Sequence, residues 1–411
     1  MENKKINILV IYDDKVGGVG YFRSISPHIY LNEKYNNIFS IDLIYQYPII
    51  GDLKSFYSKY DIIIFHKMLD GNCKMIDIIK EINPNVKIVC DIDDYFKLPK
   101  EHPMYYGSTF INKTHQKIIN TLKKVDYITT TTELFANELK KLNPNVEILP
   151  NAINENENQF KLNKIQNNRI RFGLVTGSSH LEDVKLLENM ISQLSNSDIL
   201  DKIQICLCGF NTEGTFTSYD KNGNKTQRKI SPYESVYYKM EQILTKNYTL
   251  VSEHHKNFLL NFYPNIEDPF KNEPYYRQWT LPIDSYFQHY RNIDVLLAPL
   301  VENTFNSCKS QLKLIEAGFA NIPIICQNFG PYTIDTIPFI EKGGNINEKG
   351  NSLLVDSSKN HKQWFKYINF LTKNPKYIKI MSDNLSDLVK NRYSIETVSE
   401  LRKNFYQMII S

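Results

Sequence analysis

The sequence lacks the features that would point to a membrane-spanning or secreted protein. No apolar run approaches the roughly 20 residues that a helix needs to span a bilayer. The opening residues run directly into an apolar stretch typical of a strand, without the apolar segment of a secretory signal. We therefore expect a cytoplasmic protein, which could also rest on the inner face of a membrane.

Cysteine is scarce, and its spacing disfavours a zinc site. The six cysteines lie mostly within apolar runs. The close pair Cys206 and Cys208 lacks a second pair at the spacing that zinc ligands need. We expect all six cysteines to be reduced, buried thiols.

Arginine is also scarce, and the net charge is low. Only eight of the 49 basic residues are arginine, and the formal net charge is +4 over 411 residues. So small a charge gives no sign of strong binding to a polyanion. The apolar share of 42% and the charged share of 23% are those of a soluble globular protein, long enough for two domains. The few arginines beside glycine or aromatic residues, Arg23 and Arg277, become candidates for function.

Residues 1–153 alternate continuous apolar runs with amphipathic segments. Such strands, separated by helices, predict a parallel, doubly wound sheet. The strands are predicted at residues 6–12, 39–45, 61–65, 86–90, 126–132 and 145–150. The polar stretch 154–168 has no periodicity and predicts a linker.

A second unit of the same kind is predicted over residues 169–390. Its strands and helices are interrupted by a polar, aromatic-rich insertion at about 210–285, with one helix near 233–244. The tail is predicted to be helical, and we expect the last helix, 391–411, to pack back on the first domain. The fold class is therefore α/β, with two Rossmann-like domains that face each other across a cleft.

Three aspartates, Asp91, Asp93 and Asp94, follow the strand 86–90 within four residues. Alone, they could be an Asp-x-Asp metal site. At a strand end in the first of two Rossmann-like units, they are instead expected to line the cleft. Because three carboxylates repel one another, they need partners, and hydroxyl groups, N–H groups or Lys97 are expected rather than a metal ion.

In each of the two units, a glycine-containing loop follows the first strand. Glycine allows a tight turn and a close approach to a ligand, and the N-terminus of the next helix favours an anion. The alternatives are a plain turn in the first loop and helix capping by at least one serine in the second. The candidate contacts are Gly18, Gly20 and Arg23 in the first loop, and Gly177, Ser178, Ser179 and His180 in the second.

The segment 298–332 carries the clearest pattern of charges. A strand ends at Leu300, and a helix is predicted from about Ser307. Lys309, Lys313 and Glu316 would then lie on one helix face, at i, i+4 and i+7. A solvated, ion-paired face is the alternative, but the apolar neighbours of Glu316 favour a buried carboxylate with a polar partner.

Four segments resemble parts of the GT-B-fold nucleotide-sugar glycosyltransferases, in particular the group similar to the family-4 retaining (glycosyltransferase group 1) enzymes. They are "IVCDIDDYFKLPKEHP", "VEILPNAI", "FGLVTGSSHLED" and "KSQLKLIEAGFANIPII". The resemblance implies a nucleotide-diphosphate sugar bound mainly by the second domain, without a metal or other cofactor, and an acceptor bound mainly by the first. Glu316 would bind the ribose hydroxyls, with Lys313 and Ser310 near the diphosphate.

The chain departs from this family at two places. Many members carry a glutamate near the sugar where this chain has Cys308, with Asn303, Phe305 and Asn306 nearby. The usual basic residues after the first strand of the second domain are also missing. The charge of the diphosphate is then expected to be met from elsewhere, by Lys309, Lys313 and Arg277.

The resemblance implies a retaining glycosyltransferase, with Asp93, Asp94 and Arg23 as the catalytic candidates. The donor-binding candidates are Gly177, Ser178, Ser179, His180, Arg277, Asn306, Lys309, Ser310, Lys313 and Glu316. The expected acceptor is a glycan or lipid-linked molecule in the synthesis of a surface polysaccharide (O-antigen or capsule) or a glycoconjugate.

Three alternatives remain open. A phage-type glycosyltransferase would act on modified bases of a nucleic acid, but the low net charge is unfavourable. A metal-dependent, single-domain transferase conflicts with the second Rossmann-like unit. A non-catalytic protein that binds a nucleotide-sugar would bind the donor without turning it over.

Overall fold

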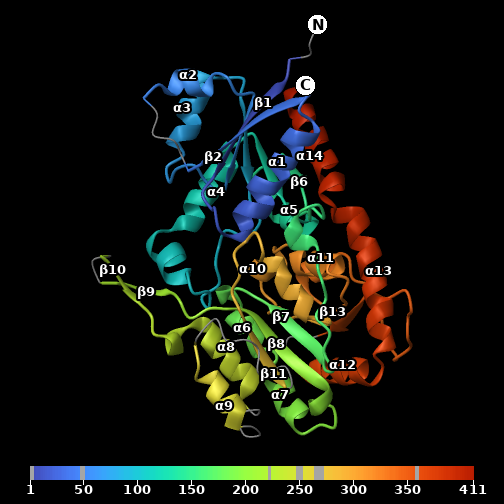
Figure 1. The fold of residues 1–411 in the computed structure, drawn as a ribbon. Helices are drawn as coiled ribbons and strands as arrows, with labels where there is room; N and C mark the ends of the chain where they lie inside the picture. Colours follow the sequence, from blue (N-terminus) through green and yellow to red (C-terminus); the bar gives the residue numbers. More distant parts are fainter. Residues whose placement is uncertain (1–3, 47–50, 221–223, 247–252, 263–272, 357–360) are drawn as a thin grey trace.

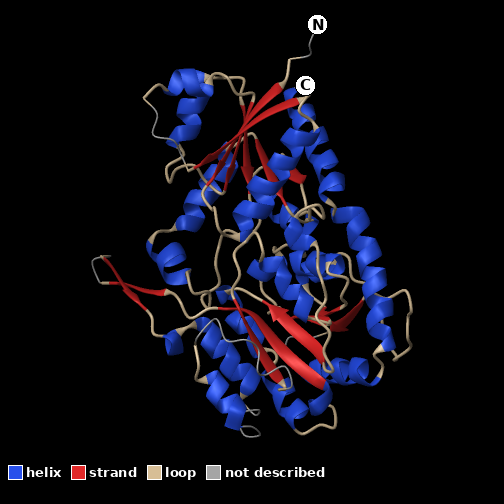
Figure 2. Ribbon diagram, in the orientation of Figure 1, coloured by secondary structure: helices blue, strands red, loops and turns tan. Residues whose placement is uncertain are grey.

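Two α/β domains make up the chain, each built on its own parallel sheet of six strands (Figures 1 and 2). The structure is a computed structural model, and it describes residues 4–46, 51–220, 224–246, 253–262, 273–356 and 361–411. The α/β architecture with two sheets agrees with the sequence prediction. Within these ranges, no helix combines the length and the apolar character needed to cross a membrane.

The first sheet has the strand order β2-β1-β3-β4-β5-β6. Its strands are continuously apolar because helices cover both faces. In β1, Leu9 and Ile11 enter one core cluster, whereas Ile8 and Val10 enter the cluster on the other face. The strands are β1 (Ile6–Tyr12), β2 (Phe39–Tyr45), β3 (Ile62–His66), β4 (Lys87–Asp91), β5 (Tyr127–Thr130) and β6 (Val146–Ile148). The helices are α1 (Ser26–Lys34), α2 (Leu53–Tyr57), α3 (Lys74–Ile82), α4 (Thr114–Lys124) and α5 (Glu133–Leu139), with π-helical segments η1 (Gly20–Ile25) and η2 (Tyr105–Ile111).

The second sheet has the order β11-β8-β7-β12-β13-β14. In β8, Ile205 and Leu207 face one cluster, and Cys206 and Cys208 face the other. The strands are β7 (Ile170–Val175), β8 (Ile203–Phe210), β11 (Tyr275–Trp279), β12 (Val295–Ala298), β13 (Ile324–Gln327) and β14 (Ser352–Val355). The helices are α6 (Leu181–Lys185), α7 (Glu188–Ser195), α8 (Val236–Thr245), α9 (Glu253–Leu259), α10 (Thr304–Ser307), α11 (Leu312–Phe319) and α12 (His361–Lys373). Short 3-10 segments include η3 (Asn158–Phe160), η4 (Ser178–His180), η5 (Leu200–Lys202), η6 (Pro232–Glu234), η7 (Tyr286–Asn292) and η8 (Gly330–Thr333).

The expected insertion at 210–285 is partly integral to the second domain. It begins with an antiparallel hairpin, β9 (Thr215–Tyr219) and β10 (Lys225–Lys229), which projects from the domain in Figure 1. It ends with β11, which pairs with β8 as the edge strand of the sheet, so this part is not an insertion. Residues 221–223, 247–252 and 263–272 of the segment lie outside the described residues.

The last two helices connect the domains. α13 (Lys376–Tyr393) packs on α11 of the second domain, and α14 (Ile395–Ile410) then packs on α1 of the first. The chain crosses at Ser394, which forms a β-bridge with Ile153 in the other crossing segment. Figure 1 shows α14 running along the first domain. The chain therefore crosses between the two domains twice. All six cysteines are free and buried, as the sequence predicted.

Candidate active site

Polar side chains gather at the carboxyl ends of the strands of the second sheet. In open α/β sheets this is where ligands bind. One cavity, of about 30 Å³, lies inside the second domain and includes Thr176, His180 and Lys313 in its lining. A second pocket, of about 120 Å³, lies between the domains, with His102 on one wall and Phe305 on the other.

The loop between β7 and α6 presents open backbone. Gly177 has an ordinary φ of −97°, and a Cβ at this position would meet nothing within 4 Å. The space beside Gly177 is therefore open, and a ligand could pack directly against the backbone there. Ser178 and Ser179 are exposed, and neither caps η4 or α6 with its side chain, so the capping alternative is wrong.

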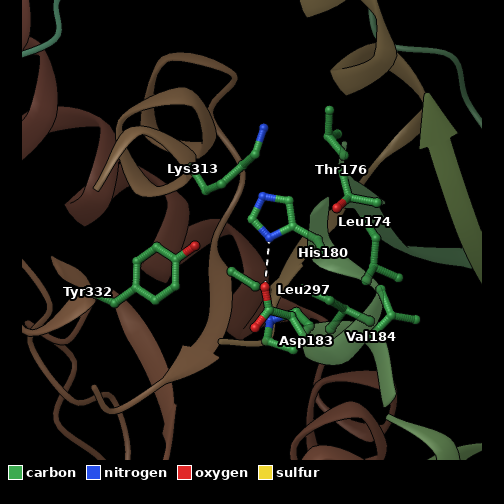
Figure 3. A pocket seen from close by; sticks show the side chains of 11 residues that line it. Leu174, Thr176, His180, Asp183, Val184, Leu297, Lys313 and Tyr332 are labelled. Carbon is green, nitrogen blue, oxygen red and sulfur yellow. Dashed lines mark hydrogen bonds and ion pairs between the residues drawn. The ribbon is translucent and has the colours of Figure 1, made fainter. Parts of the chain in front are cut away.

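Asp183 holds the site together from below this loop. Its Oδ2 pairs with Nδ1 of His180 at 2.7 Å (Figure 3). Its Oδ1 accepts from the backbone N–H of Val301 at 2.7 Å and from the side-chain amide of Asn306 at 3.3 Å. Asn306 also donates to the carbonyl of Val301 at 2.8 Å. Both amide hydrogens of Asn306 are thus engaged within the protein. Asn306, expected to bind the nucleotide-sugar, instead holds the loop after β12 in place.

His180 presents a neutral imidazole to the cavity. Burial and the nearby Lys309 lower its pKa, although the hydrogen bond with Asp183 acts in the opposite direction. Because the Asp183 carboxylate accepts, Nδ1 carries the proton. The Nε2 lone pair is then the free one on the ring, which points into the cavity beside Lys313 in Figure 3. His180 is suited to accept a hydrogen bond from a hydroxyl group.

The helix predicted from Ser307 is broken. α10 ends at Ser307, and α11 begins only at Leu312. Lys309 therefore lies in the connecting loop, with its ammonium group 5.0 Å from the ring centre of Phe305. Lys313 lies in the first turn of α11 and extends toward the cavity (Figure 3). The prediction that Lys309 shares a helix face with Lys313 is wrong. Both cations nevertheless lower the pKa of His180.

Glu316 lies in the interior rather than on the cavity surface. Its side chain is 1% exposed. Tyr286 donates to one carboxylate oxygen at 2.6 Å, and Tyr290 and Lys313 donate to the other at 2.5 and 2.9 Å. A buried carboxylate with a polar partner was predicted, and the ribose hydroxyls were expected to bind it. In the structure, its partners are protein side chains.

Arg277 does not reach the site. It lies on β11, and its guanidinium group pairs with both carboxylate oxygens of Glu241 on α8, at 2.7 and 2.6 Å. It also donates to the carbonyl of Asn261 and packs 4.1 Å from the ring centre of Phe210. Arg277 is buried and ties the edge strand to α8, so the proposed contact with a diphosphate is not made by this arrangement.

Arg23 is likewise an interior residue. It donates to both oxygens of Asp91 at 3.0 and 2.6 Å, and to the carbonyl of Leu149 at 2.6 Å and the side chain of Asn151 at 3.2 Å. Asn151 donates in turn to Ser310 at 3.1 Å, in the loop before α11. Arg23 and Ser310, expected as ligand contacts, are therefore the ends of a hydrogen-bonded chain between the domains.

The glycines of the first loop differ in role. A Cβ at Gly20 would lie 1.9 Å from the carbonyl oxygen of Asp14, so glycine is required there by close backbone packing. Gly18 is exposed, and its Cβ would have only one distant neighbour, a ring carbon of Phe22 at 3.9 Å. Gly18 thus remains a candidate for the cleft, whereas Gly20 has an internal reason to be glycine.

Two of the three aspartates at the end of β4, Asp91 and Asp93, have separate protein partners, and Lys97 is not among them. Asp91 pairs with Arg23, and Asp93 accepts from His66 at 3.0 Å and lies 3.6 Å from Lys67. Burial alone would raise the pKa of Asp93, but Lys67 and His66 outweigh it and hold this pKa below its ordinary value. Within the described ranges, no three His, Cys, Asp or Glu side chains are placed to share a metal ion.

His66 and Lys67, which meet Asp93, were not predicted as site residues. Lys67 faces three carboxylates, and Asp93, Asp94 and Asp13 raise its pKa although burial opposes them. It also has a left-handed φ of +59°, which is uncommon outside glycine. The signal was present, because "IIIFHK" is an apolar strand that ends in these two polar residues, just as the next strand ends in aspartate.

Cys308, where a glutamate was expected from the resemblance, faces the other domain. Its thiol is 1% exposed and belongs to the core cluster of the first domain, with Cys90 and Phe135. His102 and Phe305 meet beside it, with ring centres 5.6 Å apart. Cys308 therefore contributes to the packing of the two domains. It places no carboxylate in the pocket between them.

Solved structures share this fold, although no protein-family model and no curated protein sequence matches the chain. Sucrose-phosphate synthase from Thermosynechococcus elongatus superposes with a TM-score of 0.62 and 12% identity, covering 98% of this chain and 99% of its own. HepE from Anabaena, in complex with UDP, gives 0.60 and 10%, covering 98% and 100%. An E. coli trehalose-6-phosphate structure bound with UDP-2-fluoro glucose gives 0.59 and 11%, covering 98% and 99%. Together with the two six-stranded parallel sheets, these superpositions show that the chain has the GT-B fold, as the sequence predicted.

Proposed function

We propose that the protein is a glycosyltransferase that binds a nucleotide-diphosphate sugar in its second domain and transfers the sugar to an acceptor hydroxyl. One observation carries the proposal: Lys313 and His180 line one cavity at the carboxyl edge of the second sheet, next to the open backbone at Gly177, and Lys309 is near enough to lower the pKa of His180. The structural neighbours support it, since HepE was solved in complex with UDP and with UDP-glucose.

The chemistry needs positive charge where the leaving diphosphate becomes negative. Lys309 and Lys313 supply two cations, and the backbone N–H groups of residues 177–179 supply further donors. We propose that these groups replace a metal ion. A chelator such as EDTA should then leave activity unchanged.

The acceptor side is proposed to be the carboxyl end of the first sheet. Asp93 stays ionised between His66 and Lys67, so it can accept a hydrogen bond from an acceptor hydroxyl and orient it. Retention of configuration follows from the family resemblance. It would be tested by following the anomer first released during slow donor hydrolysis by NMR, with the donor's own anomer as the expected result.

The acceptor is proposed to be a glycan or lipid-linked molecule of surface polysaccharide or glycoconjugate synthesis. The first domain has an exposed apolar patch on and before η2, made by Met104, Tyr106 and Phe110. Exposed Lys97, Lys100 and Lys113 lie close to it along the chain. This combination suits contact with an anionic membrane surface.

Thermal shift with nucleoside diphosphates and their sugars tests donor binding, because a ligand of the native state raises its Tm. We expect one nucleotide class to stabilise the protein and Lys313→Ala to reduce the shift. Lys379→Ala is the matched control, since Lys379 also pairs with a carboxylate on its own helix but is 79% exposed. The proposal fails if no nucleoside diphosphate shifts the wild-type Tm.

A further inference from the structure

The hairpin of the second domain has two strand edges that no other described strand covers. β9 and β10 form a separate two-stranded sheet, which projects from the domain in Figure 1. Every residue of β10 is exposed, so the hairpin buries little apolar surface. A two-stranded ribbon of this kind is only marginally stable in water, and a further strand would stabilise it. An uncovered edge is also a template for pairing with another chain.

The hydrogen bonds at the two ends of the ladder show which backbone groups of β9 point to its free edge. The N–H of Asp220 donates to the carbonyl of Asn224 at 3.0 Å, and that of Ile230 donates to Gly214 at 3.2 Å. Bonded and non-bonded pairs alternate along an antiparallel ladder, so the odd-numbered residues of β9 direct their N–H and C=O groups away from β10. These residues are Thr215, Thr217 and Tyr219.

The two edges differ in charge. β10 has the sequence "KTQRK", and cationic side chains along an edge strand oppose pairing with another chain. β9 has the sequence "TFTSY", which contains no charged residue and consists mostly of threonine and aromatic residues that favour strands. Arg228 of β10 also donates to both carboxylate oxygens of Glu234 at 3.0 and 2.6 Å, which ties β10 to η6. The free edge of β9 is therefore the one suited to pairing.

A second copy of the chain fits this edge. Antiparallel pairing of two β9 strands about Thr217 places Thr217 opposite its equivalent and Thr215 opposite Tyr219. The backbone groups that point to the free edge then become bonded pairs. On the other face, Phe216 would lie opposite Ser218 and diagonal to the Phe216 of the second copy, a separation that aromatic rings can span. The ring of Phe216 is 50% exposed in the single chain.

The other ways of pairing two hairpins are less favourable. Two β10 strands paired about Gln227 would place Lys225 directly opposite Lys229, and like charges in this position are destabilising. Pairing β9 of one copy with β10 of the next would leave a free β9 edge at one end. Such a head-to-tail contact does not close and continues into a filament.

We propose that the protein forms a two-fold symmetric dimer in which the β9 strands of two copies pair antiparallel. The product is a four-stranded sheet with the charged β10 strands at its two outer edges. The inference goes beyond the proposed function and does not depend on it. Because the interface is small, the dimer is expected to be weak and reversible.

Sedimentation velocity of the full chain, from about 1 to 300 µM, tests the proposal, since association follows mass action. The average mass should rise from one chain toward two. Thr217→Pro removes an N–H group from the free edge and leaves the ladder with β10 intact, so it should raise the Kd of the dimer by about tenfold or more, with an unchanged Tm.

Gln227→Pro is the matched control. Gln227 lies opposite Thr217 and directs its own N–H group to the free edge of β10. Its side-chain amide donates to the hydroxyl of Thr217 at 3.1 Å, so the two proline variants lose the same side-chain bond and differ in the edge that they block. Gln227→Pro should dimerise like wild type.

Charge variants at the two-fold axis test the register without proline. Thr217→Lys and Thr217→Glu should each stay monomeric, because like charges would meet at the axis. An equimolar mixture of the two should form a heterodimer, since opposite charges then lie across from each other.

Four outcomes would overturn the proposal. Wild type that stays monomeric at the highest concentration shows that no such dimer forms. Dimerisation that Gln227→Pro weakens as much as Thr217→Pro does not use the β9 edge specifically. A mass that grows beyond two chains indicates head-to-tail pairing. A mixture of the lysine and glutamate variants that stays monomeric shows that residue 217 does not lie at the axis.

Discussion

Two pairs of oppositely charged side chains are buried in this protein. Arg23 with Asp91 and Arg277 with Glu241 are buried pairs, joined by two hydrogen bonds each. Removing one partner of such a pair strands a charge and costs about 3–5 kcal/mol. His28 is the contrasting case, since it lies fully buried and both its ring nitrogens have uncharged partners. Its Nδ1 pairs with the carbonyl of Ser24 and its Nε2 with the hydroxyl of Tyr406.

His28 should make the protein less stable in acid. Burial and Arg402 lower its pKa to about 3, whereas an unfolded histidine titrates near about 6.5. The unfolded state therefore binds more protons between these values, so the stability present above about pH 6.5 falls as the pH is lowered toward 3. The free energy of unfolding, measured with urea between pH 7 and 4, should fall more steeply for wild type than for His28→Gln. Equal slopes would contradict this account.

The scarcity of arginine was informative but misread. Arg23 and Arg277 were expected to meet a ligand because each stands beside glycine or aromatic residues. Both arginines instead lie in the interior, where Arg23 pairs with the buried Asp91 at the end of β4 and Arg277 pairs with the buried Glu241 on α8. No local pattern shows which distant carboxylate lies opposite an arginine, since the partners are 68 and 36 residues away.

At the scale of elements, the break between α10 and α11 shapes the candidate site. The sequence predicts one helix from Ser307, and its helical spacing is sound from Leu312 onward. Asn303 caps α10 through the backbone N–H of Asn306, and Ser310 is bonded to Asn151 of the crossing segment. The bond between Ser310 and Asn151 comes from another part of the fold, so the local helical pattern cannot show it.

The position of α11 depends on close packing against α13. A Cβ at Gly318 would lie 2.2 Å from a methyl carbon of Val389 and 3.0 Å from the carbonyl oxygen of Leu385. Gly318→Ala should therefore destabilise the protein by about 1–3 kcal/mol through overpacking, measured by urea unfolding. Gly177→Ala is the control, since its Cβ would meet nothing within 4 Å. If both variants unfold alike, α11 is not held in this way.

At the scale of the whole molecule, the alternation of apolar strands and helices was enough to predict two Rossmann-like domains. The pattern works because both sheets are covered on both faces, which gives every central strand a continuous apolar run. This pattern could not predict how the two domains pack against each other. The chain Asp91–Arg23–Asn151–Ser310 and the packing of Cys308 on the first domain are contacts between segments remote in sequence.

The exposed patch on the first domain predicts binding to anionic vesicles. Met104 and Phe110 are each 62% exposed, and Tyr106, 51% exposed, stacks on Phe110. The protein should sediment with vesicles of phosphatidylglycerol more than with phosphatidylcholine, and the double variant Met104→Ser, Phe110→Ser should reduce this several-fold. Phe216→Ser on β9 is the control, because that ring is 50% exposed but lies on the second domain. Equal sedimentation of wild type with both lipids would rule out the proposed contact.

The most direct test of the whole account is the release of nucleoside diphosphate from a panel of UDP-, ADP-, GDP- and dTDP-sugars. We expect the wild-type protein to turn over at least one donor. The double variant Lys309→Ala, Lys313→Ala should lower kcat/KM for that donor by about 10²-fold or more, with its Tm preserved, because charge on the leaving group is no longer stabilised. A donor that binds without any release would identify a binding protein, and a panel in which nothing is bound or released would contradict the account.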